Sequence, residues 1–478
     1  MNQESVGRRE TLSNLTRREM LTRSGMGLGT LGLAGLLADA ETSSANALTL
    51  RPLALRPSHF PARVKRVVHF FLNGGPSQVD TFDPKPMLTK YAGQTIPETL
   101  RTERKTGAAF PSPFSFQRYG QSGLEISELF SKMAQHADDL AVIRSMYASV
   151  PNHEPSLMLM NCGDNVQPRP SVGSWVLYGL GTENENLPGF VAMCPDGLPI
   201  KDAENWQAAF LPGVYQGTHL DTKHTELNKL IENIQHPHVT TDAQRRQLDL
   251  LLRFNSEHRD TRLDTRLDAR IATFELAFRM QLEAAEAFDL SRETAASQAM
   301  YGETVHGRQT LIARRLLERG VRYVQLWHGA GQPWDHHNKI EESHRRTAGE
   351  IDQPIAALLT DLKQRGLFDD TLVIWGGEFG RTPTVELHGN GQSGLGRDHN
   401  HYGFSVWLAG GGVRGGTAYG ATDDFGFKAV EKPTSIHDLH ATILHLLGLN
   451  HEKLTYRYAG RDFRLTDVHG KVLREILA

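Results

Sequence analysis

Three short polar clusters lie between Trp334 and His401, and each contains residue types that bind metal ions. They read W-D-H-H at 334–337, G-G-E-F-G-R-T-P at 376–383 and G-R-D-H-N-H at 396–401. Carboxylates and imidazoles are ligands that divalent cations commonly take in proteins. Each cluster sits beside glycine or another turn-forming residue, which leaves space for an ion. The pattern predicts a metal site whose ligands are Asp335, His337, Glu378, Asp398 and His399.

These ligand types do not distinguish zinc, calcium or manganese. Asp335 and His337 are two positions apart, so in an extended loop they would project to the same side. The alternative is that the carboxylates pair with arginines and only hold loops together. The arginines available for that role are Arg381, Arg397 and Arg414.

Two further segments carry groups that could react. Ser77 follows N-G-G-P and is either a nucleophile or a helix cap, and capping is the favoured interpretation. His153 lies in N-H-E-P-S, before an apolar run that predicts a helix, and helix N-termini favour anions such as phosphate or sulfate. In the alternative, Ser156 caps that helix and His153 is exposed. Arg381 has the planar fork that stabilises anionic oxygens.

Five β-branched and aromatic runs predict the strands that position these groups, and helical segments at 309–319 and 355–365 precede two of them. Strands alternating with helices predict a mainly parallel sheet covered on both faces, with ligands bound beyond the carboxyl ends of the strands. Asn73, His328 and Glu378 all follow predicted strand ends, so we expect the polar clusters to meet at one edge. The runs are Val64–Leu72, Leu140–Arg144, Val321–Trp327, Thr371–Trp375 and Phe404–Ala409.

A charged helical insertion is predicted at about residues 240–300. Arg262–Arg270 and Phe274–Glu286 read as two amphipathic helices with a solvated face. The polar segment Thr102–Gly123 is predicted to be a surface loop.

The first 47 residues read as a twin-arginine signal peptide. T-R-R-E-M-L at 16–21 precedes an apolar run from Gly25 to Leu37, and A-N-A at 45–47 supplies a cleavage site. The run is shorter than the roughly 18–20 residues of a membrane span, so no stable span is expected. We expect export by the twin-arginine translocase to the periplasm or beyond. A linker at 48–63 and a single domain at 64–478 follow.

Composition narrows the possible functions. The formal net charge of −3 argues against a general nucleic-acid binder. The 22 histidines fit a metal site. The two cysteines, Cys162 and Cys194, cannot form a disulfide framework and read as buried small residues.

Motifs across nearly the whole predicted mature chain resemble the alkaline phosphatase and sulfatase superfamily. More narrowly, the chain resembles a twin-arginine-exported, sulfatase-like family whose biochemistry is largely unassigned. The resemblance implies a three-layer α/β/α fold with a central, mostly parallel sheet. The stretches that carry it include F-L-N-G-G-P-S-Q-V-D-T-F-D-P-K-P (71–86), N-H-E-P-S (152–156), G-E-F-G-R-T-P (377–383), L-A-G-G-G-V-R-G-G (408–416) and D-L-H-A-T-I-L-H-L-L-G (438–448).

The chain departs from the sulfatase pattern at four positions. Glu378 stands where a metal-binding Asp is usual, and Phe379 replaces the following His. His153 stands where C-x-P-S sulfatases have the cysteine that matures to formylglycine. Asn73 replaces the usual Asp of the first strand. These changes argue against formylglycine-dependent sulfate hydrolysis.

The expected function is an exported, metal-dependent hydrolase of phosphate or sulfate esters, acting on a small molecule or a glycan. Its catalytic residues would be Ser77, His153 and Arg381. The principal alternative is a catalytically degenerate protein that binds a sulfated glycan or a protein partner. A metal-dependent phosphomutase or nuclease on the same scaffold is a third possibility.

Overall fold

The computed structural model describes residues 52–231, 234, 239–262 and 266–478. The predicted signal peptide and the start of the predicted linker lie outside this range. None of the helices in these segments is long and apolar enough to cross a membrane.

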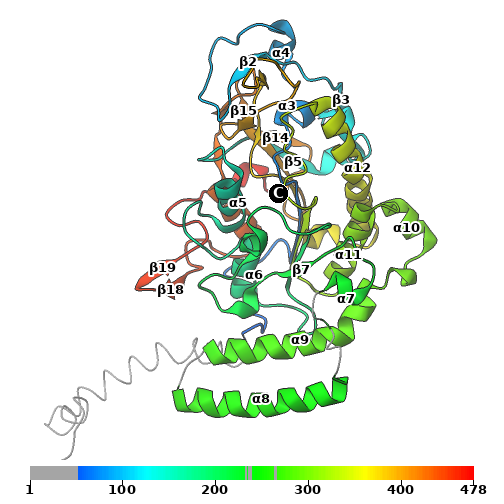
Figure 1. Cartoon of the computed structure of the whole chain (residues 1–478), viewed down its shortest axis with the longest axis vertical. Helices are drawn as coiled ribbons and strands as arrows, with labels where there is room; N and C mark the ends of the chain where they lie inside the picture. The colour runs from blue at the N-terminus through cyan, green and yellow to red at the C-terminus, as the bar shows by residue number, and fades with distance from the viewer. Residues whose placement is uncertain (1–51, 232–233, 235–238, 263–265) are drawn as a thin grey trace, which may run out of the picture. The chain divides into compact units, whose positions relative to one another are not determined.

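A nine-stranded sheet runs through the described part of the chain (Figure 1). The central strand β1 pairs in parallel with β8 and β9. Beyond β8, β6 and β7 continue the parallel order. In spatial order the strands are β14 (Thr417–Tyr419), β5 (Leu140–Tyr147), β13 (Phe404–Gly410), β9 (Thr371–Gly376), β1 (Arg66–Phe71), β8 (Tyr323–Trp327), β6 (Phe190–Met193) and β7 (Thr218–Leu220), with β17 (Thr434–Ser435) also paired to β5.

Helices cover both faces of this sheet, because alternate residues of each strand point to opposite sides. Val67 and Phe71 of β1 belong to the core shared with α5 (His153–Cys162), α6 (Val172–Leu180) and α13 (Ile436–Leu446). Val68 and Phe70 belong to the core shared with α11 (Val305–Glu318) and α12 (Ile340–Gln364). Figure 1 shows α5 and α6 on one side of the strands and α11 and α12 on the other. The predicted three-layer α/β/α fold is confirmed.

All five predicted strands are present, but one of them runs against the others. β13 is antiparallel to both β9 and β5. The consequence is local: the start of β13, and not its end, lies at the carboxyl edge of β9 and β5. The segment before β13 therefore reaches the edge where the other strands end.

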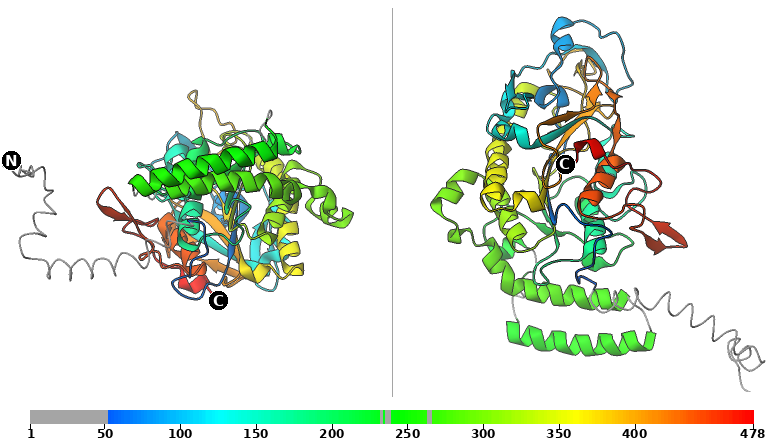
Figure 2. Two further views of the ribbon diagram at one scale, coloured as in Figure 1. Left: turned by 90° about the horizontal axis from the view of Figure 1, so that it is seen from below. Right: turned by 180° about the vertical axis from the view of Figure 1, so that it is seen from behind.

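The helical insertion contains α8 (Thr241–Arg262), α9 (Arg266–Phe288) and α10 (Ala295–Tyr301). The predicted boundaries of the helices Arg262–Arg270 and Phe274–Glu286 were wrong, since Arg262 ends α8, and α9 contains both Arg266–Arg270 and the whole of Phe274–Glu286. Residues 263–265 lie outside the described part of the chain. No glycine or proline interrupts residues 271–273, so nothing stops the helix there. Arg245 of α8 donates to Glu275 of α9 at 2.7 and 3.0 Å, and the two helices lie side by side in both views of Figure 2.

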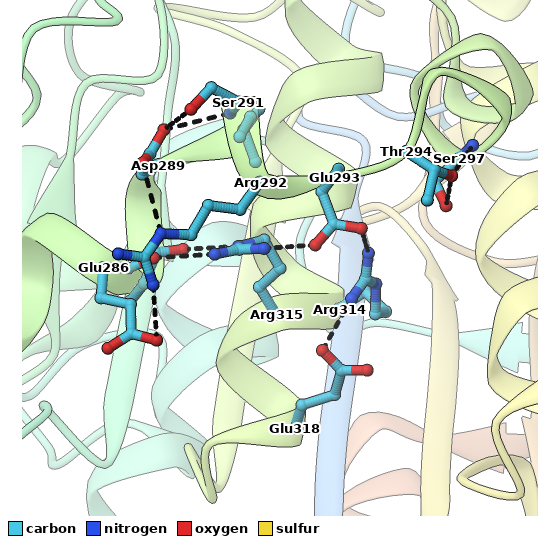
Figure 3. Close-up of polar contacts among 12 residues, drawn as sticks. Glu286, Asp289, Ser291, Arg292, Glu293, Thr294, Ser297, Arg314, Arg315 and Glu318 are labelled. Atoms are coloured by element: carbon cyan, nitrogen blue, oxygen red, sulfur yellow. Dashed lines mark hydrogen bonds and ion pairs between the residues drawn. The ribbon is translucent and has the colours of Figure 1, made fainter.

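Buried ion pairs connect this insertion to α11. The Glu293 carboxylate, between α9 and α10, pairs with both Arg314 and Arg315 (Figure 3). Arg315 Nε also donates to the Ala287 carbonyl at 2.9 Å, which fixes the end of α9 against α11. Arg314 Nε lies 3.1 Å from Asp361 Oδ2 of α12. These contacts hold the end of α9 and the segment before α10 against α11, and they hold α11 against α12.

Candidate metal centre

Segments from four places in the sequence meet at the carboxyl edge of the sheet. His153 is the first residue of α5, which follows β5. Asp335 lies in the loop between β8 and α12, and Glu378 follows β9. The two-residue strands β10 (Gly380–Arg381) and β12 (His399–Asn400) pair antiparallel, which places Arg381 opposite His399. The predicted convergence at one sheet edge is confirmed.

Three imidazoles surround one oxygen of Asp335. The Nε2 atoms of His153, His337 and His399 lie 3.3, 2.8 and 3.2 Å from Asp335 Oδ1. Opposite them, Arg381 Nη2 donates to the same oxygen at 2.7 Å. The carboxylate of Asp335 is therefore the centre of the cluster.

A second carboxylate stands behind each imidazole. His153 Nδ1 lies 2.7 Å from Glu378 Oε1, and His399 Nδ1 lies 2.7 Å from Glu103 Oε2. His337 Nδ1 contacts Glu386 Oε2. An ionised carboxylate only accepts, so each Nδ1 must carry the proton. Neutral imidazoles in this tautomer aim their Nε2 lone pairs at Asp335, which is the outer-shell arrangement typical of histidines that bind metal ions.

Several buried atoms at this edge have no hydrogen-bond partner within the described residues. They are His153 Nε2, His337 Nε2, Glu378 Oε2 and Asp398 Oδ1. Buried polar atoms are almost always satisfied, so four such atoms together call for a ligand. His153, Asp335 and His399 form one group with ligand atoms within 4.8 Å of one another, and His337, Asp398 and His399 form a second. The residues fit one divalent cation, since both groups use His399 and its Nε2 can bind only one ion.

Burial and the close approach of oppositely charged groups determine the pKa values at the site. Burial raises the pKa of Asp335, but Arg381 and the three imidazoles outweigh it and hold this pKa far below its usual range. Burial lowers the pKa of His153 and His337, yet their carboxylate neighbours reverse the direction and raise both. The position between these two imidazoles and Asp335 thus favours a positive charge.

Two glycines let the segments approach this closely. Gly74 has φ +113°, and a Cβ there would lie 2.5 Å from the Asp335 nitrogen. A Cβ on Gly396 would lie 2.0 Å from the His337 carbonyl carbon. Gly74 also donates its N–H to Glu378 Oε1 at 2.9 Å. The glycine-rich turns seen in the sequence are thus needed for backbone contact as well as for space around an ion.

Arg381 is fully buried and all its donors are directed at the protein. Nε donates to the Gly75 carbonyl at 2.9 Å, Nη1 to the Arg397 carbonyl at 3.3 Å, and Nη2 to the Gly74 carbonyl as well as to Asp335. This geometry favours a positioning role for Arg381. Its predicted catalytic role is not tested by these contacts. The pair of Arg381 with Asp335 is one that the loop-holding alternative predicts, whereas Arg397 pairs with Asp80, which is not among the predicted ligands.

Ser77 occupies the N-cap position of α3 (Gln78–Thr81), but its side chain makes no capping hydrogen bond. The favoured capping interpretation is therefore wrong. Its Oγ is buried without a partner, and its backbone N–H donates to His344 Nε2 at 3.1 Å. The predicted role of Ser77 as nucleophile stays a prediction.

His153 is buried at the N-terminus of α5, so the alternative that it is exposed is wrong. Ser156 donates from Oγ to the Val150 carbonyl at 2.8 Å and caps no N–H. Asn73 does not point to the cluster, since its Nδ2 donates to the Gly329 and Gly331 carbonyls. Both cysteines are buried and free, as predicted.

Sequence reasoning missed Glu103 and Glu386, two of the three carboxylates behind the histidines. Glu103 lies in the segment predicted to be a surface loop, and the backbone N–H of the next residue, Arg104, donates to Asp398 Oδ2 at 2.6 Å. Glu386 ends β11 (Thr384–Glu386), which pairs with β2 (Thr106–Ala109). A lone glutamate has no local signal, and only this long-range pairing brings both loops to the site.

Fold and site together define an α/β protein with a carboxylate-backed histidine centre at the carboxyl edge of its sheet. The chain belongs to the family described as "Protein of unknown function (DUF1501)", which it matches over residues 64–477. No curated protein sequence matches it.

The chain is similar to several solved structures at low sequence identity. One is the PsFucS1 sulfatase from Pseudoalteromonas sp., with 12% identity, 87% of this chain and 72% of that chain covered, and a TM-score of 0.38. A second is a protein in the alkaline phosphatase superfamily from Vibrio parahaemolyticus, with 9% identity, 84% and 70% coverage, and a TM-score of 0.37. A third is the alkaline phosphatase of the Antarctic bacterium TAB5, with 11% identity, 80% and 98% coverage, and a TM-score of 0.35.

Proposed function

We propose that this chain is an exported metal-dependent hydrolase of phosphate or sulfate esters. The observation that carries the proposal is the convergence of three carboxylate-backed imidazoles on Asp335 Oδ1. His153, Asp335, His337 and His399 would hold the ion, with Asp398 and Glu378 Oε2 as further ligands. A divalent cation bound there supplies Lewis-acid polarisation and charge neutralisation for an ester oxygen.

The chain's own groups would bind the anionic part of such an ester. His153 and Glu154 begin α5, where the first N–H groups of a helix have no partner within the helix. A helix N-terminus favours a phosphate or sulfate group, and this one lies beside the cluster. Arg381 would hold Asp335 in place through their 2.7 Å contact.

Ser77 is the candidate nucleophile, since its buried Oγ has no other partner. His344 Nε2 accepts the Ser77 N–H, so His344 carries its own proton on Nδ1 and donates it to His336 Nδ1, 2.7 Å away. This chain of contacts fixes the backbone of Ser77 and leaves the hydroxyl free to turn. A solvent water activated at the cluster is the competing nucleophile.

The twin-arginine motif at 16–21 supports export to the periplasm or the extracellular space. Twin-arginine export carries folded proteins, which suits a centre whose ligands come from distant segments. Small-molecule or glycan esters are the proposed substrates, since the net charge of −3 does not suit polymeric nucleic acid.

The test combines metal analysis with turnover. The mature chain from Leu48 is purified, its metal content is measured, and aryl phosphate and aryl sulfate esters are offered with zinc, manganese or calcium. We expect stoichiometric metal and hydrolysis, both lost in Asp335→Ala and His399→Ala. His401→Ala, two residues from a ligand but outside both ligand groups, is the matched control and should keep both. Absence of stoichiometric metal in the wild type would sink the proposal.

A second candidate, a degenerate binding protein, is favoured by one feature. The Phe379 ring lies 4.8 Å from the His153 ring and 4.7 Å from the His399 ring, at the position where the resemblance implies a histidine. Bound metal without turnover of either ester class, together with retention on a sulfated glycan column, would decide for this candidate.

A further inference from the structure

A second cluster of possible metal ligands lies on the α11–α12 side of the sheet. His306 is in the first turn of α11, His328 directly follows β8, and Glu350 lies within α12. Their ligand atoms lie within 4.8 Å of one another. His328 Nε2 is 2.8 Å and His306 Nε2 is 3.8 Å from Glu350 Oε2. No residue of this cluster belongs to the centre around Asp335.

The hydrogen bonds of Gln309 determine the tautomer of His306. Gln309 Nε2 donates to the Met193 and Trp327 carbonyls at 2.9 and 3.1 Å, so the orientation of its amide is fixed. Gln309 Oε1 therefore faces His306 Nδ1 at 3.3 Å and must accept from it. In a neutral His306 the Nε2 lone pair then faces the Glu350 carboxylate.

Two lone-pair atoms that face each other can both bind a cation placed between them. A proton on His306 would make an imidazolium, which burial disfavours, because the side chain is only 12% exposed. Arg346 pairs with the other oxygen of Glu350, at 3.3 Å, and so leaves Oε2 for the histidines. His328 Nδ1 is buried without a partner, so moving the His328 proton from Nε2 to Nδ1 breaks only the contact with Glu350.

We propose that His306, His328 and Glu350 bind a second divalent cation of the zinc class. Ligand atoms around a tetrahedral zinc, with bonds of about 2.0–2.1 Å, lie about 3.3 Å apart. The 2.8 and 3.8 Å separations bracket that value, so each histidine nitrogen needs to shift by only about half an ångström relative to Glu350 Oε2. Two histidines and a glutamate leave a fourth position for water.

The ion would steady the loop that carries the first centre. His328 begins the loop and Asp335 lies near its end, with Trp334 packed edge-on against the His328 ring at 5.6 Å. Asn73 holds the same loop through the Gly329 and Gly331 carbonyls. A cation on His328 would add a link from this loop to both α11 and α12.

Crystals of the mature protein grown with Zn²⁺, with anomalous diffraction measured at the zinc edge, test the proposal directly. We expect a peak among the three ligand atoms, separate from any peak at Asp335, so that failure at one centre is distinguishable from failure at the other. Absence of a peak among His306, His328 and Glu350 would overturn the inference.

Zinc content measured in solution supplies a second readout. Glu350→Gln keeps the shape of the side chain and should lower bound zinc by one equivalent, and His306→Ala should do the same. His445→Ala, a half-buried helical histidine outside the cluster, is the control and should bind zinc as the wild type does. Wild-type stoichiometry in both cluster variants would contradict the second site.

Discussion

Glu386→Gln is the sharpest test of the candidate metal centre, because Glu386 contacts His337 but lies outside both groups of candidate ligands. Both carboxylate oxygens are occupied: Oε2 accepts from His337 Nδ1, and Oε1 lies 3.2 Å from Arg104. Glutamine keeps the shape and one acceptor oxygen. It removes the negative charge that orients the imidazole and makes its Nε2 a better ligand.

The expected loss of metal affinity follows from the kind of contact that is removed and from the burial of the carboxylate. Removing an outer carboxylate typically weakens metal binding 10- to 100-fold, or about 1.4–2.7 kcal/mol. Glu386 is only 2% exposed, so solvent screens its charge little, and we expect a loss near the upper end. Glu103, which is 31% exposed behind His399, should show a loss near the lower end in Glu103→Gln.

The assay is competition for Zn²⁺ against a chromophoric chelator. The variants are compared in the Glu350→Gln background, so that zinc at the second proposed site does not contribute. Glu293→Gln is the matched control, because Glu293 is also a buried, paired carboxylate, but its partners are arginines. Wild-type affinity in Glu386→Gln would refute the reasoning, as would an equal loss in Glu293→Gln.

Three further outcomes follow from the same contacts. Asp335→Asn should abolish metal binding. It should also lower the free energy of unfolding of the metal-free protein by about 3–5 kcal/mol, because the buried charge of Arg381 loses its carboxylate partner. Denaturant titration of the metal-free protein measures this loss, and an unchanged midpoint would contradict it. Ser77→Ala should change stability by less than about 1 kcal/mol, since its Oγ bonds nothing, yet should abolish ester turnover, and an unchanged rate would assign attack to water. Burial raises the pKa of Glu293, but Arg314 and Arg315 outweigh it and lower this pKa. The stability from this pair is therefore complete above about pH 4.5 and is lost as the pH falls through the lowered pKa, so the difference in unfolding free energy between wild type and Glu293→Gln should shrink on acidification.

Local patterns in the sequence predicted most of the candidate ligands but not how the site is completed. Asp335, Glu378 and His399 lie in segments near the ends of β8 and β9 and the start of β13, and a sheet collects such segments at one edge. His153, predicted as a catalytic residue, lies among the candidate ligands. Glu103 and Glu386 meet the site through the pairing of β2 with β11, which neither segment encodes alone. The direction of strands is also invisible to a hydrophobic run, and the antiparallel β13 was not predicted for that reason.

The predicted helix boundaries were wrong for a different reason. The charged repeat at 262–270 suggested a helix separate from Phe274–Glu286, although residues 271–273 between them include no glycine or proline to end a helix, and α9 continues from Arg266 to Phe288. Capping was likewise assigned to Ser77 from residue type and position. The structure leaves its hydroxyl unpaired, since capping also requires a side-chain rotamer directed at the helix N–H groups.

The charge balance explains why the centre suits a cation better than a set of salt bridges. With neutral imidazoles, five carboxylates and two guanidinium groups at the site leave a net charge of about −3. Protonating all three histidines would cancel this charge, but each imidazolium would then direct a proton at one oxygen, Asp335 Oδ1, which Arg381 already contacts. A divalent cation removes most of the same charge and satisfies several lone pairs together, without placing four donors on one acceptor. The charged groups counted are Glu103, Asp335, Glu378, Glu386 and Asp398, with Arg104 and Arg381.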